Sequence, residues 1–137
     1  MVNLEQLESG KTHEVRITIT GEMVENFARA TGDYNPIHMD EDYAKGTLFK
    51  TRVVHGMLHA GLISGIMGTR FPGAGTIYLS QTLKFLEPVF IGDEITYRLK
   101  ALEYLKETNR LRVETVCINQ RGEAVLTGEA LVMPPHK

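Results

Sequence analysis

The stretch that decides the fold is residues 53–69, which read VVHGMLHAGLISGIMGT. These 17 residues carry no formal charge. A membrane-spanning helix needs about 20 mostly apolar residues, and this shorter run includes two histidines, a serine and four glycines. We therefore expect a helix over Gly56–Thr69 that is apolar on every side and buried inside a folded protein. Each glycine lowers helix propensity by up to about 1 kcal/mol, so we expect other backbone or a ligand to come close to them.

The regions around this helix alternate between apolar and polar residues, which is the period of half-buried strands. In the first of them, Val15, Ile17 and Ile19 alternate with polar side chains. Turn residues at 108–109 and 120–122 separate the later ones. Five strands are predicted, over 14–20, 76–89, 93–106, 111–118 and 124–133. We expect an α+β fold in which a curved antiparallel sheet of about five strands wraps around the long central helix. The sheet would bury the helix on most sides and explain its glycines.

Two further helices are predicted between the first strand and the central helix. Apolar residues recur at helical spacing over 21–30, and the Thr20 hydroxyl can accept a free amide of the first turn. This helix ends at Thr31-Gly32, and a short helix follows near 41–45. The edge strands of such a sheet pair readily with another copy, so we expect a homodimer.

The whole chain is short and almost neutral. Its 137 residues correspond to a single domain over 1–137, at about 150 residues per domain. The net charge of −2, with no basic stripe, argues against a nucleic-acid partner. The single cysteine, Cys117, is expected to be a small buried hydrophobe in a reducing compartment. Residues 1–11 lack the apolar core of a signal peptide, so we expect a cytoplasmic protein with no membrane partner.

Residues 33–38, DYNPIH, place a carboxylate and an imidazole on one short ordered loop. Pro36 restricts its own φ and pushes Asn35 out of the helical region, which stiffens the loop. An ionised Asp33 only accepts hydrogen bonds, whereas His38 donates or accepts. The two can therefore hold one water and move its proton, a step worth roughly 10²–10⁴-fold in rate. The alternative is that Asp33 caps a turn and His38 is a surface residue.

Gly56 would begin the central helix. Its N–H is then one of the unpaired donors at a helix N-terminus, where the helix dipole favours negative charge. That donor can stabilise a carbonyl oxygen that gains charge in a transition state. The alternative is a tight strand-to-helix turn without chemistry, and the acid–base loop upstream favours the first interpretation.

His55 and His59 are four residues apart and share a helix face, so they could bind a metal together with His38 or Asp33. The acid of the zinc pattern H-E-x-x-H is missing between them. We expect no metal. His55 is interpreted as a hydrogen-bonded turn residue, and His59 as a buried or pocket-lining residue.

The stretch 30–38, ATGDYNPIH, resembles the hydratase motif of the MaoC-like family, and the chain is similar to the (R)-specific enoyl-CoA hydratases. The likeness continues through 54–58 (VHGML), 75–81 (GTIYLSQ) and 88–93 (PVFIGD) and covers roughly residues 12–133. The sequence does not depart from this pattern. The resemblance implies a hot-dog fold, a homodimer and a thioester substrate.

The implied activity is reversible addition of water to a trans-2-enoyl-CoA, which gives the (R)-3-hydroxyacyl-CoA. The resemblance implies that Asp33 and His38 hold and activate the water and that Asn35 shapes their loop. It also implies that the Gly56 amide polarises the thioester carbonyl and that Ser64 lies near the catalytic pair. No separate cofactor is implied, because coenzyme A is part of the substrate.

Three other functions are compatible with parts of this pattern. A 3-hydroxyacyl-[acyl-carrier-protein] dehydratase uses the same chemistry on a different carrier. A hot-dog acyl-CoA thioesterase would hydrolyse the thioester, and the loop at 33–38 argues against it. A non-catalytic acyl-CoA-binding module would leave the acid–base pair idle. The acyl chain length, the carrier and the direction of the reaction stay open, as does the division of acid and base roles between Asp33 and His38.

Overall fold

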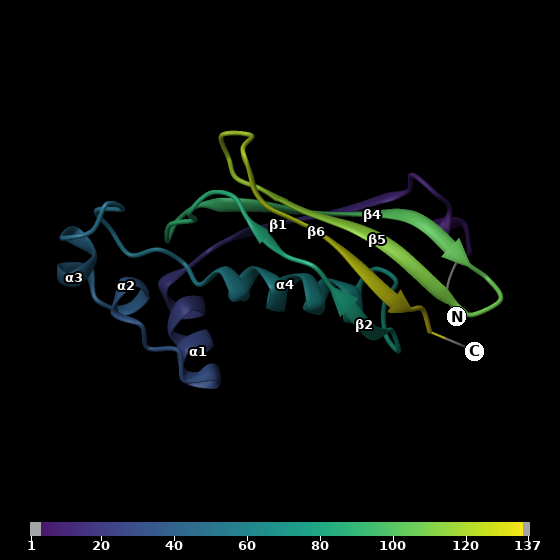
Figure 1. Cartoon of the computed structure of the whole chain (residues 1–137), viewed down its shortest axis with the longest axis horizontal. Helices are drawn as coiled ribbons and strands as arrows, with labels where there is room; N and C mark the ends of the chain where they lie inside the picture. The colour runs from purple at the N-terminus through teal and green to yellow at the C-terminus, as the bar shows by residue number, and fades with distance from the viewer. Residues whose placement is uncertain (1–3, 136–137) are drawn as a thin grey trace.

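A computed structural model describes residues 4–135, in which one antiparallel sheet curves over a long helix (Figure 1). The predicted single domain over 1–137 also includes residues 1–3 and 136–137, which lie outside the described residues. The sheet has six strands in the order β1-β4-β5-β6-β2, and β3 pairs with β6. Their bounds are β1 Thr12–Thr18, β2 Ile77–Gln81, β3 Lys84–Phe85, β4 Glu94–Leu105, β5 Arg110–Ile118 and β6 Ala124–Met133. The predicted α+β fold, a curved antiparallel sheet packed on a long central helix, is confirmed.

The alternation read from the sequence describes the central strands correctly. Along β4, Ile95, Tyr97, Leu99 and Ala101 have no exposed surface, while their sequence neighbours reach solvent. β5 pairs with this strand so that Tyr97 lies opposite Cys117. The Cys117 side chain is fully buried, and this burial raises the pKa of its thiol to about 12. The expected role of Cys117 as a buried hydrophobe is therefore confirmed.

The single long strand predicted over 76–89 is wrong, because this segment forms two short strands, β2 and β3. The register shifts between Tyr78 and Ser80 as β2 pairs with β6. Next to this shift the backbone of Thr82 crosses β6 at Gly128, where a Cβ would collide with the Thr82 carbonyl. This crossing therefore requires glycine at position 128. The break between β2 and β3 gives the sheet six strands rather than about five.

The helices between β1 and the central helix lie together at one end of the molecule (Figure 1). A 3₁₀ turn, η1 (Leu4–Leu7), precedes β1, and α1 spans Gly21–Thr31, α2 Pro36–Met39 and α3 Glu41–Lys45. The Thr20 hydroxyl accepts from the Met23 amide at 3.2 Å, and Gly32 ends α1 in a left-handed conformation with φ 79°. Both ends of α1 therefore follow the sequence prediction within one residue.

The central helix, α4 (Gly56–Thr69), has the predicted bounds but is not buried on every side. Leu58, Ile63, Ile66 and Met67 face the sheet and are buried. The opposite face, formed by Met57, Gly61, Ser64 and Gly65, is exposed. The expected burial on most sides is therefore wrong for a single chain, because its own sheet covers only one face of the helix.

The chain's own sheet does not come close to most of the helix glycines, contrary to the prediction. A Cβ added at Gly61, Gly65 or Gly68 would meet nothing within 4 Å, because these residues do not face the sheet. Only Gly56 has a close neighbour, the Phe85 ring, 2.7 Å from where its Cβ would lie. Within residues 4–135, no helix combines the length and the hydropathy needed to cross a bilayer.

Candidate active site

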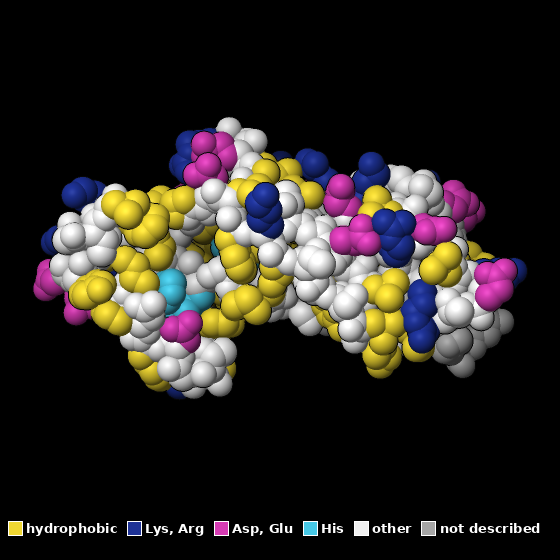
Figure 2. All heavy atoms as spheres, viewed as in Figure 1, with side chains coloured by type: hydrophobic (Ala, Val, Ile, Leu, Met, Phe, Trp, Pro, Cys, Tyr) yellow, Lys and Arg dark blue, Asp and Glu magenta, His cyan; other side chains and the backbone are white. Residues whose placement is uncertain are grey.

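The end of the molecule that carries α1, α2 and α3 brings together three polar side chains, two from the segment 33–38 and one from residue 55. Asp33, His38 and His55 each offer one polar atom, and these atoms all lie within 4.8 Å of one another. Asp33 is exposed, His38 is half-buried and His55 is buried. Histidine and acidic atoms share the surface at this end, among hydrophobic side chains (Figure 2). The carboxylate and imidazole of the 33–38 segment therefore meet at a surface that solvent can reach.

Local hydrogen bonds hold the Asp33 segment in place. The Asp33 amide donates to the Thr31 hydroxyl at 3.2 Å, and the Asn35 amide donates to Asp33 Oδ1 at 3.3 Å. The Asn35 side chain then accepts from the Ile37 amide at 3.2 Å and caps α2. This segment was expected to be an ordered loop. Its second half is instead one helical turn that begins at Pro36, whose missing N–H costs nothing at the first helical position.

Contacts with residues far along the chain hold His38. Its Nδ1 lies 2.7 Å from the Val53 carbonyl oxygen, which can only accept a hydrogen bond. Nδ1 therefore carries the ring proton, and Nε2 of the neutral ring has a free lone pair. The Arg52 Nε donates to the His38 carbonyl at 2.6 Å, which fixes the backbone of the same turn. Sequence analysis missed Arg52, because a contact between residues 14 apart leaves no periodic signal.

His55 connects the two halves of the cluster. Its Nε2 lies 3.0 Å from the Asp33 carbonyl oxygen, and its ring lies 4.1 Å from the His38 ring at a tilt of 31°. Burial, the largest cause, lowers the pKa of His55. The ring is therefore neutral at neutral pH and adds no positive charge beside His38. The interpretation of His55 as a hydrogen-bonded turn residue is confirmed, and its packing against the His38 ring is new.

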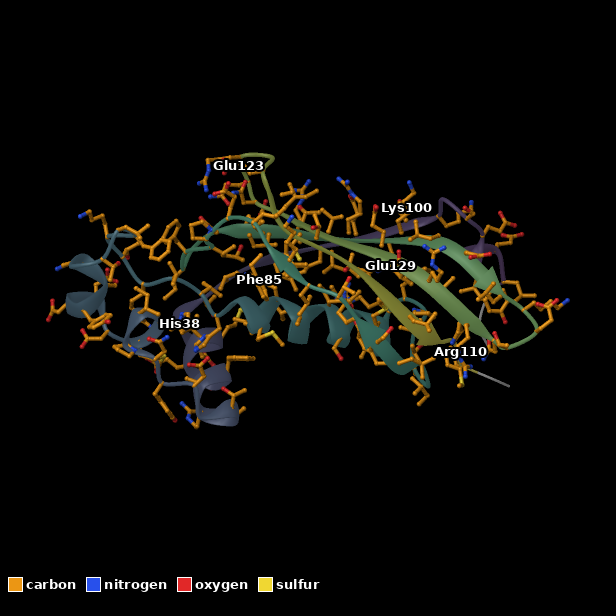
Figure 3. All side chains as sticks on the ribbon, in the orientation of Figure 1. His38, Phe85, Lys100, Arg110, Glu123 and Glu129 are labelled. Carbon is orange, nitrogen blue, oxygen red and sulfur yellow. The ribbon has the colours of Figure 1, made fainter. Side chains whose placement is uncertain are left out.

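Gly56 follows directly as the first residue of α4, so its amide is one of those without an intrahelical acceptor. A cavity of about 500 Å³ opens beside it. The buried wall of the cavity consists of Val53, Val54, His59, Val89 and Val125. Exposed residues surround its mouth, among them Met57 and Phe85. Figure 3 shows Phe85 above the start of α4 and His38 beyond it.

The cavity and the polar cluster are neighbours. His38 bonds to the carbonyl of Val53, which itself lines the cavity. Gly56 and Val53 line the cavity, whereas Asp33 and His38 are not among its lining residues and are linked to it through the contact of His38 with Val53.

The four-residue spacing of His55 and His59 does not make a joint metal site. His59 Nδ1 bonds to the Tyr97 hydroxyl at 2.8 Å, and His59 lines the cavity as expected. Among residues 4–135, the side chains with metal-compatible spacing are Asp33, His38 and His55. The expectation that no metal binds stays a prediction.

The structure does not bring Ser64 to this cluster within one chain. Ser64 lies two turns along α4, about 12 Å of helix rise from Gly56, on the exposed face of the helix.

Comparisons with known proteins show the family to which the chain belongs. The family described as MaoC like domain matches residues 3–122. The chain is 46% identical over 133 residues to a 3-hydroxybutyryl-CoA dehydratase of Methylorubrum extorquens, covering 97% of this chain and 84% of that protein. It is 43% identical over 133 residues to an (R)-specific enoyl-CoA hydratase of Rhodospirillum rubrum, covering 97% and 92%.

A solved structure with the same fold is the unliganded R-hydratase of Pseudomonas aeruginosa. The two structures superpose with a TM-score of 0.93 at 43% identity, covering 99% of this chain and 87% of that one. The hot-dog fold implied by the sequence is therefore confirmed along nearly the whole chain.

Proposed function

Because the chain belongs to the MaoC-like family, we propose that it is an (R)-specific enoyl-CoA hydratase. It adds water reversibly to a trans-2-enoyl-CoA and forms the (R)-3-hydroxyacyl-CoA, which makes it a hydro-lyase. One observation carries this function: Asp33 and His38 meet beside a cavity that begins at the Gly56 amide. Addition of water to a conjugated thioester needs a base, an acceptor that holds the water and a donor to the carbonyl oxygen. His38, Asp33 and the Gly56 amide can supply these three roles.

His38 is the base of the proposed reaction. Its Nδ1–H donates a hydrogen bond to the Val53 carbonyl, so the lone pair of Nε2 can take a proton. Asp33, which only accepts when ionised, holds the second hydrogen of the water. The water oxygen forms a bond to C3 as one of its O–H bonds breaks and the proton passes to His38 Nε2.

Gly56 stabilises the charge that this attack creates. The π electrons of the C2=C3 bond move toward the thioester and place negative charge on its oxygen. The Gly56 amide and the positive end of the α4 dipole face that charge. The proton held by His38 then passes to C2, which completes the addition and restores the neutral imidazole.

The neighbours of the pair keep this geometry fixed. His55 holds the Asp33 backbone and packs on the His38 ring, while Asn35 caps the turn that carries His38. A misplacement of about 1 Å in such a site can cost about 10²-fold in rate. The role of Asn35 is therefore positional, since its side chain is used by the Ile37 amide.

A homodimer forms part of the proposal. β2 is the last strand of the sheet, and its Ile77 and Leu79 side chains are 53% and 41% exposed. An unpaired edge strand with apolar side chains readily pairs with a second copy. The chain's own sheet does not cover the exposed face of α4, which includes Ser64, so a second copy could cover it. Light scattering during gel filtration should give twice the chain mass, and Ile77→Lys should shift the protein toward monomer.

The activity is tested by mixing the purified protein with crotonyl-CoA and following the loss of the enoyl absorbance, with chiral analysis of the product. The proposal expects rapid loss and the (R)-3-hydroxybutyryl product. Release of free thiol from a saturated acyl-CoA would instead support a thioesterase. No change with either compound would support a binding module. Faster turnover of the matching acyl-carrier-protein thioester would make the protein a dehydratase of carrier-bound substrates.

No cofactor beyond the coenzyme A part of the substrate enters this mechanism. A cytoplasmic location is proposed with it, because the single cysteine of the sequence, Cys117, is a buried free thiol that fits a reducing compartment. Metal analysis of the purified protein and assay after dialysis against a chelator test the remaining expectation, that Asp33, His38 and His55 act without a metal.

A further inference from the structure

The buried wall of the cavity beside Gly56 is apolar except at one position. Four valines, Val53, Val54, Val89 and Val125, form most of it. The fifth buried residue is His59, which is only 3% exposed. A polar ring at the inner wall of an apolar cavity is a costly choice unless it serves a purpose.

A second buried group holds the His59 ring. Its Nδ1 lies 2.8 Å from the hydroxyl of Tyr97, whose side chain is fully buried on β4. Burial lowers the pKa of His59 to about 4, so the ring is neutral at neutral pH. With Nδ1 engaged and the ring lining the cavity, Nε2 is the nitrogen left to face the cavity. The inner wall thus presents an uncharged hydrogen-bonding group.

The position of His59 along α4 relates this group to the proposed substrate. His59 follows Gly56 by three residues, about 4.5 Å of helix rise. If the thioester carbonyl lies at the Gly56 amide, this rise equals only a few carbon–carbon bonds of the acyl chain. A four-carbon chain would end before or beside His59, and a longer one would lay methylene groups over Nε2.

We propose that His59, held in place by Tyr97, marks the end of the acyl site and restricts the enzyme to short acyl chains. This inference rests on the proposed hydratase function. A short chain leaves room for a water on Nε2. A longer apolar chain displaces that water without replacing its hydrogen bond, and an unsatisfied polar group of this kind lowers affinity about tenfold or more.

The test compares the kcat/KM for trans-2-octenoyl-CoA with that for crotonyl-CoA in the wild type and three variants. The double variant His59→Leu/Tyr97→Phe removes both polar partners together, which avoids a stranded hydroxyl. Tyr97→Phe alone keeps the His59 ring polar. Val125→Ala enlarges the cavity at the same wall without changing the polarity of the wall. Thermal denaturation of each variant identifies the folded ones.

The wild type should favour crotonyl-CoA, and the ratio for the longer substrate should rise about tenfold in the double variant, chiefly through its KM. Tyr97→Phe and Val125→Ala should each move the ratio less than the double variant does, because both keep the polar His59 ring. A folded double variant with an unchanged ratio would overturn the inference, as would a wild type that prefers the octenoyl substrate or a larger change in Val125→Ala. Failure of the wild type with every enoyl thioester would instead overturn the proposed function itself.

Discussion

The β4–β5 sheet and the segment from Asp33 to Gly56 obey different rules. Along β4 the surroundings of a residue follow from its place in an alternating pattern, since inward residues are fully buried. In the other segment, His38 depends on Val53 and Arg52, which are 15 and 14 residues away. The stability of the sheet is spread over many similar contacts, so the loss of any one of them has a small effect. In the other segment, a few specific contacts fix the position of each functional group. Changes in the two regions should therefore have separable effects on stability and on activity.

The largest expected effect separates chemistry from stability. Asp33→Asn and His38→Gln should each lower crotonyl-CoA hydration by about 10²–10⁴-fold, because the first removes the carboxylate that holds the water and the second removes the base. The unfolding midpoint should stay near that of the wild type, since Asp33 is exposed and His38 half-buried. Steady-state kinetics and thermal denaturation curves, measured on the same samples, provide the check.

His55→Asn is a matched comparison for these two variants. It removes the ring that packs on His38 but leaves both acid–base groups in place. Its rate should fall less than that of His38→Gln. Near-normal rates in Asp33→Asn or His38→Gln would remove the assignment of that residue.

The same contrast explains what could be predicted from the sequence. The inward face of β4, the cap at Thr20 and the bounds of α4 follow from local chemistry, and all were predicted. The break between β2 and β3 was missed because it depends on Gly128, some 46 residues beyond Thr82 in the chain. A spacing of this kind carries no periodic signal.

The site was predictable to the same extent. Asp33 and His38 stand close together in the sequence, so their convergence was expected. The tautomer of His38 and the contacts of Arg52 and His55 come from tertiary packing. The exposed face of α4 was missed because an apolar composition does not say which molecule covers it.

The second prediction concerns the boundary between the two regions. A Cβ at Gly56 would lie 2.7 Å from the Phe85 ring of β3. Gly56→Ala should therefore shift the start of α4 or the ring, and a misplaced amide should lower kcat/KM by up to about 10²-fold. The double variant Gly56→Ala/Phe85→Ala should recover part of the loss. An equally inactive double variant would show that crowding by Phe85 is not the cause.

The third prediction uses the buried His59–Tyr97 pair, which joins α4 to the sheet. Burial lowers the pKa of His59 from 6.5 to about 4, so the unfolded chain binds a proton more readily than the folded one. The stability from this group is complete above pH 6.5 and is lost as the pH falls toward 4. The loss should be about 2 kcal/mol at pH 5.

Urea denaturation at pH 7.5 and pH 5 measures this loss. The folded variant His59→Leu/Tyr97→Phe lacks the titrating ring and should lose less stability between the two pH values than the wild type. Equal losses in both proteins would show that other groups cause the acid sensitivity.

The smallest effect is expected on the outer face of the sheet. Arg98 Nε bonds to Glu14 Oε2 at 2.9 Å, and the two residues face each other across β4 and β1. Their side chains are 41% and 50% exposed, so solvent screens the pair and its worth is at most about 1 kcal/mol. Arg98→Thr should therefore lower the free energy of unfolding by less than that and leave kcat/KM for crotonyl-CoA within about twofold. A tenfold rise in KM would contradict this expectation, because it would give an outer-face cation a part in binding the phosphates of coenzyme A. The separation between a sheet that supplies stability and a segment that supplies chemistry would then fail at Arg98.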